Sequence, residues 1–201
     1  MTHLSRSRGA AAQFFTVGLL ALIWFVPVQG KAVAERFTAF AVNLDSTTPL
    51  RTGAGQIEMV INRYSTEGEA DKLMTTLIER GPDKLLDELQ KAPRIGYIRT
   101  PGSLGYDLRF ARKFRDDEGG ERVVIMTDRY ITFWEAANRP RTIDYPFTVI
   151  EMRLNREGEG EGKLSLYTKI EADKHNKTVV LENYGTQPVL LKNVRRTGTS
   201  D

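Results

Sequence analysis

Residues 144–172 have the sequence DYPFTVIEMRLNREGEGEGKLSLYTKIEA, which predicts two long β-strands joined by a glycine-rich turn. In the second arm, residues 164–172 alternate between two kinds of side chain, the period of two that gives a strand one buried and one wet face. Residues 145–150 of the first arm are largely apolar on both faces, so we expect this strand in the middle of the sheet, covered on both sides. Gly158, Gly160 and Gly162 separate the arms and are expected to supply the positive φ angles of a hairpin loop.

A change of hydrophobic period from two to 3.6 marks a helical insertion after the second predicted strand. Thr66 and Glu69 have the spacing of a capping box, in which each side chain satisfies a free backbone N–H at a helix start. Gly81 ends this helix and Pro82 opens another, so a helix pair is expected over about residues 67–91. We expect the pair to cover one face of the sheet, and a partner-binding amphipathic element is the alternative.

The other apolar patterns bring the total to about nine strands in meander order. With the helix pair they predict an α+β fold, mainly an antiparallel β-sheet that forms a barrel or a sandwich. Residues 35–194 are therefore expected to form a single β-rich globular domain. Residues 195–201 have nothing to bury and are expected to be a frayed tail.

The first 34 residues have the pattern of a signal peptide. A basic start is followed by an apolar run over residues 14–28 and then by Ala32-Val33-Ala34, the small-x-small pattern at which signal peptidase cuts. The mature chain would then begin at Glu35. An uncleaved membrane anchor is the alternative, because the apolar stretch approaches the roughly 20 residues that span a bilayer.

Composition narrows the function classes. The chain has 29 basic and 26 acidic residues, but Arg6, Arg8 and Lys31 precede the predicted cut, which leaves 26 of each in the mature chain. A neutral chain lacks the surplus of positive charge that nucleic-acid binding needs. The chain has no cysteine, which excludes thiol nucleophiles, thiolate zinc sites and a lipid anchor on an N-terminal cysteine. An exported bacterial protein, periplasmic or extracellular, is the interpretation that fits best.

Candidate catalytic residues are few. His175 is the only histidine after the predicted cut, and it lies in a charged turn with no glycine-flanked serine for it to activate. No cofactor or metal is therefore predicted. Carboxylates on or beside strands leave one catalytic alternative, a hydrolase that acts on envelope or extracellular polymers through a pair of acids. The candidates are Asp107, Asp128, Glu135, Asp144 and Glu151.

Aromatic side chains are spread over the predicted strands. In a closed barrel of about eight or more strands, some of them would line a cavity able to hold one small apolar ligand. The alternative is that these rings simply fill the core. The candidate ligand-binding residues are Tyr106, Phe110, Trp134, Tyr145 and Tyr167.

Four segments between Arg94 and Glu182 carry a resemblance to known sequences. They are Gly96-Tyr97-Ile98-Arg99, residues 105–111 (GYDLRFA), Thr127-Asp128-Arg129 and Asp144-Tyr145-Pro146-Phe147. This pattern resembles a family of uncharacterised exported bacterial proteins. The resemblance covers most of the mature chain and implies no activity.

From these observations we predict an exported, non-enzymatic binding domain. Its partner would be a small apolar molecule inside the sheet or another envelope protein on its surface, with membrane contact only through an uncleaved N-terminal segment. The alternatives are the carboxylate-dependent hydrolase and a structural protein that self-associates through an exposed sheet edge.

N-terminal sequencing of the exported protein tests the leader. We expect the mature chain to start at Glu35, because the small residues before it fit the peptidase site. Membrane-bound material that still starts at Met1 would instead establish the uncleaved anchor.

Overall fold

The computed structural model describes residues 34–43, 53–115, 119–129, 131, 147–173, 178–183 and 187–200. Among these residues, no helix is both long and apolar enough to span a bilayer. The elements, in chain order, are β1 (Ala34–Asn43), β2 (Gly53–Ile61), α1 (Glu67–Arg80), α2 (Pro82–Lys91), β3 (Gly96–Arg99), β4 (Tyr106–Leu108), β5 (Phe110–Arg115), β6 (Glu121–Thr127), β7 (Phe147–Leu154), β8 (Glu159–Asp173), β9 (Thr178–Asn183) and β10 (Val189–Ser200).

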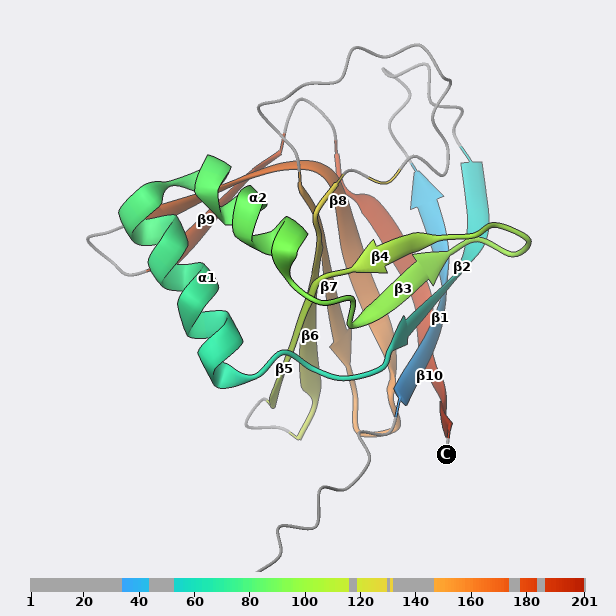
Figure 1. The fold of residues 1–201 in the computed structure, drawn as a ribbon. Helices are drawn as coiled ribbons and strands as arrows, with labels where there is room; N and C mark the ends of the chain where they lie inside the picture. The colour runs from blue at the N-terminus through green and yellow to red at the C-terminus, as the bar shows by residue number, and fades with distance from the viewer. Residues whose placement is uncertain are drawn as a thin grey trace, which may run out of the picture. The chain divides into compact units, whose positions relative to one another are not determined.

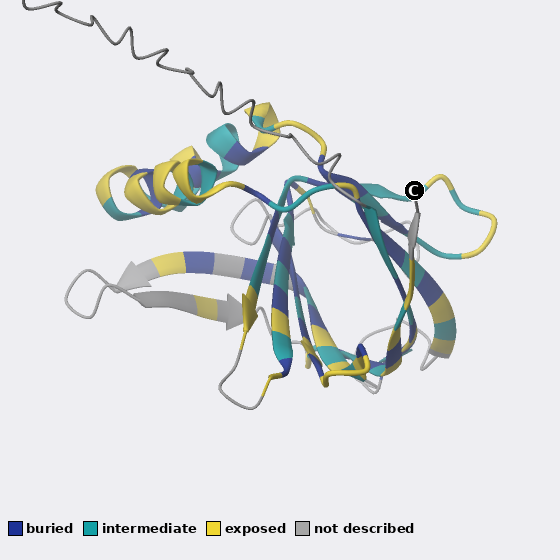
Figure 2. Ribbon diagram, turned by 90° about the horizontal axis from the view of Figure 1, so that it is seen from below, coloured by how far each residue is buried: buried dark blue, intermediate teal, exposed yellow. Residues whose placement is uncertain are grey.

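The strands form one antiparallel sheet that curls into a nearly closed barrel (Figures 1 and 2). Nine strands follow the order β4-β3-β2-β1-β10-β8-β7-β6-β5, and β9 pairs with β8 off this path. The α+β, mainly antiparallel fold predicted from the sequence is confirmed. The strand predicted to be covered on both faces is β7, in which all four residues from Phe147 to Ile150 are buried.

The two ends of the strand path are β4 and β5, which are consecutive in the chain and separated only by Arg109. The Arg109 N–H donates to the Met126 carbonyl in β6 at 3.1 Å, which passes the chain from pairing with β3 to pairing with β6. Beside this junction, the Ser65 N–H donates to the Ala111 carbonyl at 2.8 Å, and the Ala111 N–H donates to Ser65 Oγ at 3.2 Å. The segment after β2 is therefore hydrogen-bonded to the start of β5, beside the junction where the two ends of the sheet meet. We call this junction the seam of the barrel.

One continuous cluster of buried apolar side chains fills the barrel interior. It includes Phe37, Ile98, Leu108 and Ile150, each with 0% of its surface exposed. Every second residue along a strand points into the barrel, and these residues are among them. The core therefore follows directly from the period of two in the sequence. Burial of this apolar surface is the main favourable term in folding a chain that has no disulfide.

The helix pair covers the outer face of the sheet over β5 to β8 (Figures 1 and 2). Thr66 and Glu69 form the predicted capping box, and Gly81, with φ 85°, separates the helices. Leu77 and Leu89 are buried in a second apolar cluster outside the barrel, together with Phe147 of β7 and other residues. The predicted covering role of the pair is thereby confirmed.

The strand β8 extends well beyond the barrel. One of its edges pairs with β10 near its start and with β9 near its end. The far half of β8 and β9 form an arm that projects from the barrel on the side of the helices (Figure 2). Ile170 on this arm is buried in the second apolar cluster, so the arm supports the helix pair.

Two expectations about local structure were wrong. Gly160 and Gly162 lie within β8 and pair with β7, so only Gly158, with φ 79°, supplies a positive φ angle to the turn. Residues 195–200 are part of β10 and pair with β1 or β8, so they are not a frayed tail. The tail prediction failed because the inward-facing residue of this segment, Arg196, is charged and forms ion pairs. A search for alternating apolar residues does not detect such a strand.

A glycine-to-alanine comparison tests the close strand pairing. A Cβ at Gly160 would collide with the Arg153 carbonyl of β7, so we expect Gly160→Ala to cost roughly 1–3 kcal/mol of unfolding free energy. Gly68→Ala is the control, because open space surrounds that position in α1 and alanine favours a helix by up to about 1 kcal/mol. Urea denaturation measures both; a Gly160→Ala protein as stable as the parent would contradict the observed pairing.

Candidate functional site

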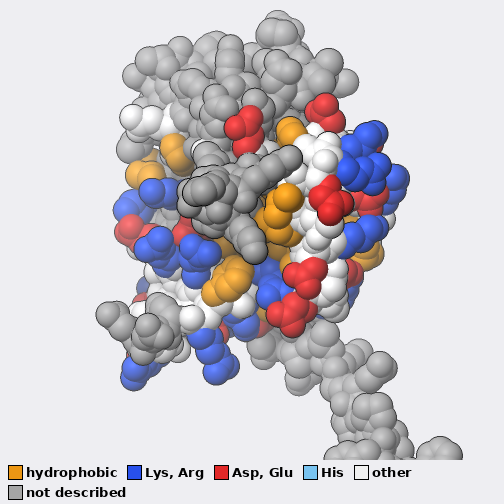
Figure 3. Space-filling view, turned by 90° about the vertical axis from the view of Figure 1, so that its left-hand side faces the viewer, with side chains coloured by type: hydrophobic (Ala, Val, Ile, Leu, Met, Phe, Trp, Pro, Cys, Tyr) orange, Lys and Arg blue, Asp and Glu red, His pale blue; other side chains and the backbone are white. Residues whose placement is uncertain are grey.

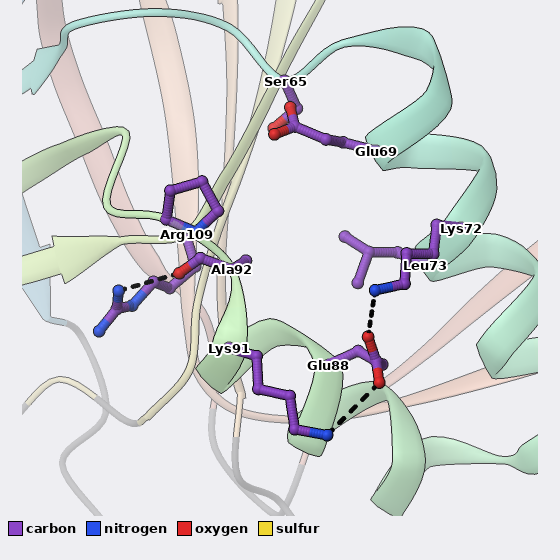
Figure 4. A pocket seen from close by; sticks show the side chains of 9 residues that line it. Ser65, Glu69, Lys72, Leu73, Glu88, Lys91, Ala92 and Arg109 are labelled. Atoms are coloured by element: carbon purple, nitrogen blue, oxygen red, sulfur yellow. Dashed lines mark hydrogen bonds and ion pairs between the residues drawn. The ribbon is translucent and has the colours of Figure 1, made fainter.

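A cleft lies between the helix pair and the seam of the barrel (Figure 4). Its volume is about 240 Å³. Residues from α1, from the end of α2 and from the segments that tie the seam surround it. The lining residues are Ser65, Glu69, Lys72, Leu73, Glu88, Lys91, Ala92, Pro93 and Arg109.

One face of α1 and the last turn of α2 form two opposite walls of the cleft. Glu69, Lys72 and Leu73 are three and four residues apart on α1, so they share one face. The opposite wall is the last turn of α2, and Pro93 follows soon after it because proline cannot continue a helix. Leu73 points into the space between the walls (Figure 4). The cleft thus combines an apolar floor with charged edges.

Two lysines hold one carboxylate at the edge of the cleft. Lys72 Nζ lies 2.6 Å from Glu88 Oε2, and Lys91 Nζ lies 3.5 Å from Glu88 Oε1, so each ammonium contacts one oxygen. The hydrogen bond from Lys72 lowers the pKa of Glu88. The lysine side chains are 68% and 71% exposed, whereas that of Glu88 is 15% exposed. The carboxylate therefore belongs to the wall, and the lysines belong to the rim.

Glu69, on the other side of the cleft, is fully engaged. It accepts hydrogen bonds from two Arg63 nitrogens at 2.8 and 2.7 Å and from the Thr66 N–H at 2.8 Å. The Arg63 hydrogen bonds lower the pKa of Glu69 to about 2. Because Arg63 compensates this charge, Glu69 fixes the start of α1 and does not repel an anion from the rest of the cleft.

Arg109 joins the helix layer to the barrel seam. Its Nη1 donates to the Ala92 carbonyl at 3.0 Å and so satisfies the C-terminal end of α2. Its Nε lies 3.4 Å from Asp128 Oδ2, and its Nη2 lies 3.6 Å from Asp107 Oδ2. Figure 4 shows the guanidinium directed away from the centre of the cleft. Arg109 therefore holds the walls of the cleft in place, and Lys72 and Lys91 are the more exposed cations of its lining.

The acids proposed for hydrolysis have arginine partners wherever they are described. Asp107 also pairs with Arg94 at 3.0 Å, and Glu151 pairs with Arg153 at 3.3 Å on the outside of the sheet. Asp107 and Asp128 are brought to the same arginine, because both pair with Arg109. Glu135, Asp144 and His175 lie outside the described residues. Within the described ranges, no group of three or more candidate metal ligands occurs.

The aromatic candidates do not converge where they can be placed. Tyr106 of β4 packs against the cluster inside the barrel, whereas Phe110 of β5 packs against the cluster under the helices. Trp134 and Tyr145 lie outside the described residues. Tyr167 lies in β8, but its side chain is not described. Tyr106 and Phe110 therefore contribute to two different apolar layers.

A second charged cluster, not predicted from the sequence, lies at one end of the barrel interior. Lys113 Nζ lies 2.6 Å from Glu35 Oε1, and Arg196 Nε lies 3.2 Å from Glu35 Oε2. Arg196 also pairs with Glu121, and Tyr64 donates a hydrogen bond to Glu35 at 3.0 Å. Two acids and two bases balance one another, so this internal network closes the end of the barrel.

Sequence patterns could not reveal these two charged groups. In the sequence, Glu35, Lys113, Glu121 and Arg196 resemble ordinary polar residues of strands, and their meeting depends on barrel closure. The pairing of Lys72 with Glu88 depends on the angle between two helices. One local signal was available, since Lys72 and Leu73 lie on the same helical face as the capping residue Glu69.

Comparison with known proteins found no matching family model, no matching curated protein and no similar solved structure. The resemblance to exported bacterial proteins therefore stays a prediction.

Alkaline denaturation tests the internal network. Burial and the Glu35 charge raise the pKa of Tyr64, whereas an unfolded tyrosine ionises near pH 10. The unfolded state therefore loses its proton first, and the stability that Tyr64 contributes is present below about pH 10 and lost above it. We expect Tyr64→Phe to cost about 1 kcal/mol at neutral pH and less above pH 10. Urea denaturation at both pH values measures this, and a cost independent of pH would contradict the assigned burial.

Proposed function

We propose that this chain is an exported, non-enzymatic binding domain that takes a small amphipathic anion in the cleft between the helix pair and the barrel seam. The observation that carries the proposal is the combination, in one concave site, of an apolar floor with two exposed lysines. The signal-peptide pattern of residues 1–34 supports export.

The filled barrel favours a site on the outside. Inward-facing side chains form one cluster of buried residues, so the described interior has side chains where a barrel ligand would lie. The cleft is outside this cluster. Its volume of about 240 Å³ is below the roughly 300–1,000 Å³ of pockets for drug-sized ligands, which points to a small molecule.

The charges around the cleft favour an anion. Arg63 compensates Glu69, while Asp107 and Asp128 compensate Arg109, which leaves Lys72 and Lys91 opposite the single Glu88. Exposed ion pairs contribute only about 0–1 kcal/mol, so a ligand can recruit one of these lysines at little cost. The Lys72 and Lys91 ammonium groups each contact one oxygen of the Glu88 carboxylate, so the distance between them is compatible with a carboxylate.

The apolar floor favours an aliphatic part. Leu73, Ala92 and Pro93 are the apolar residues among those that line the cleft. Each methylene that a ligand buries there adds about 0.8 kcal/mol, which is roughly a fourfold gain in affinity. The small volume limits this gain to a few methylenes.

A series of straight-chain fatty carboxylates, from acetate upward, tests the proposal by isothermal titration calorimetry. We expect saturable binding that tightens about fourfold per methylene and then levels off when the cleft is full. The absence of saturable binding across the whole series would contradict the proposed function.

Lysine variants locate the bound anion. Lys72→Ala should weaken binding roughly tenfold, because it removes a charge-assisted hydrogen bond. Glu88→Gln should tighten binding, because it removes the carboxylate that competes for both lysines. Lys84→Ala is the matched control, since Lys84 pairs with Asp87 on α2 and does not line the cleft. An equal loss in Lys84→Ala would assign the binding to general surface charge.

A further inference from the structure

A basic patch with an exposed aromatic ring lies on the outside of β5 and β6, away from the cleft. Phe114 is 41% exposed, and two guanidinium groups lie over its ring, with Arg112 Cζ at 5.9 Å and Arg122 Cζ at 5.2 Å from the ring centroid. Neither arginine has an ion pair with an acid among the described residues. We call Arg112, Phe114 and Arg122 the Arg–Phe–Arg patch.

The strand register adds a third positive charge beside the patch. Arg122 of β6 lies directly opposite Arg153 of β7. Like charges opposite each other on a sheet are unfavourable. The two acids beside Arg153 already have partners, since Glu151 pairs with Arg153, and Glu161, opposite Arg153 on β8, pairs with Lys192. The outward side chains of this corner therefore carry a surplus of positive charge. Figure 3 shows Lys and Arg side chains at the left and lower part of this face and also at its upper right.

The patch lies at the end of the barrel where β1 begins. Lys113, between Arg112 and Phe114, contacts Glu35 in β1 at 2.6 Å, and Ala34 is the first residue of that strand. The starts of β1 and β6 lie together at the lower end of the barrel in Figure 1. Five residues, 29–33, separate Ala34 from the predicted apolar leader, and they span at most roughly 20 Å.

From these observations we infer that the Arg–Phe–Arg patch docks on the anionic headgroups of a phospholipid bilayer. The guanidinium fork binds phosphate oxygens in pairs, and an aromatic ring between two arginines suits the interface between headgroups and acyl chains. While the leader is in the membrane, the short connection keeps this end of the barrel within reach of the headgroups. The patch is independent of the cleft and of its ligand.

An arginine-labelling experiment on the full chain tests the docking surface. The chain is bound to vesicles of phosphatidylcholine alone or of phosphatidylcholine with phosphatidylglycerol, treated with an arginine-selective dicarbonyl and analysed by mass spectrometry. The leader is present in both samples, so the difference between them reports headgroup charge. We expect Arg112 and Arg122 to react several-fold more slowly on the anionic vesicles, and the difference to shrink in high salt.

Arg129 is the internal control, because its side chain is 60% exposed and lies beyond the opposite end of β6. Its labelling should be the same on both vesicles. Equal labelling of Arg112 and Arg122 on both vesicles would overturn the inference. Protection of these arginines by soluble polyglutamate, but not by anionic vesicles, would also overturn it and assign the patch to an acidic polypeptide.

The sequence between β5 and β6 offers a further check, because it holds three consecutive acids, Asp116, Asp117 and Glu118. Replacing all three by the corresponding amides removes negative charge that is close to Arg112 and Arg122 in the sequence. The replacement should increase the protection of Arg112 on anionic vesicles. Weaker protection in this variant would contradict docking through the patch.

Discussion

The closure of the sheet at Arg109 is the constraint on which the other parts depend. The chain changes partner from β3 to β6 across this single residue, and the hydrogen bonds between Ser65 and Ala111 tie the seam beside it. A barrel without this junction would leave the edges of β4 and β5 open, together with their unpaired backbone groups. The same residue receives the end of α2 through the Ala92 carbonyl, so barrel closure and helix position are fixed together.

This shared junction explains why the cleft occurs where it does. The helix pair packs on β5 to β8 through the second apolar cluster, while its ends are attached at Ser65 and Arg109. Between the packed face and the attached ends, a cleft separates the helices from the barrel. Lys72 of α1 and Lys91 of α2 line this cleft. The concave site is therefore a consequence of placing a helical layer over a curved sheet. In the proposed function, the filled barrel would serve as the support and the helix layer would provide the surface for a ligand.

Local patterns predicted much of this fold, and contacts between distant segments account for the rest. The helix pair followed from the Thr66 and Glu69 capping box and from Gly81, all of which act within a few residues. The inner strands followed from the apolar period of two. The seam at Arg109 did not follow, because one residue that changes strand partners has no periodic signature. The cleft lysines were missed for a similar reason, since Lys72 meets Glu88 only after the helices pack. The last strand was mistaken for a tail because Arg196 holds its inward position through Glu35 and Glu121.

The strand β5 shows how one short basic segment acquires two roles. Residues 110–115 have the sequence FARKFR, and the composition gives no reason to distinguish one cation from another. The pleat separates them, because Lys113 points into the barrel and meets Glu35, while Arg112 and Phe114 point outward. The inward charge is compensated by the internal network and contributes to the closed end. The outward charge has no such compensation among the described residues, so the same alternation that stabilises the barrel also leaves a cationic surface available to an anionic partner.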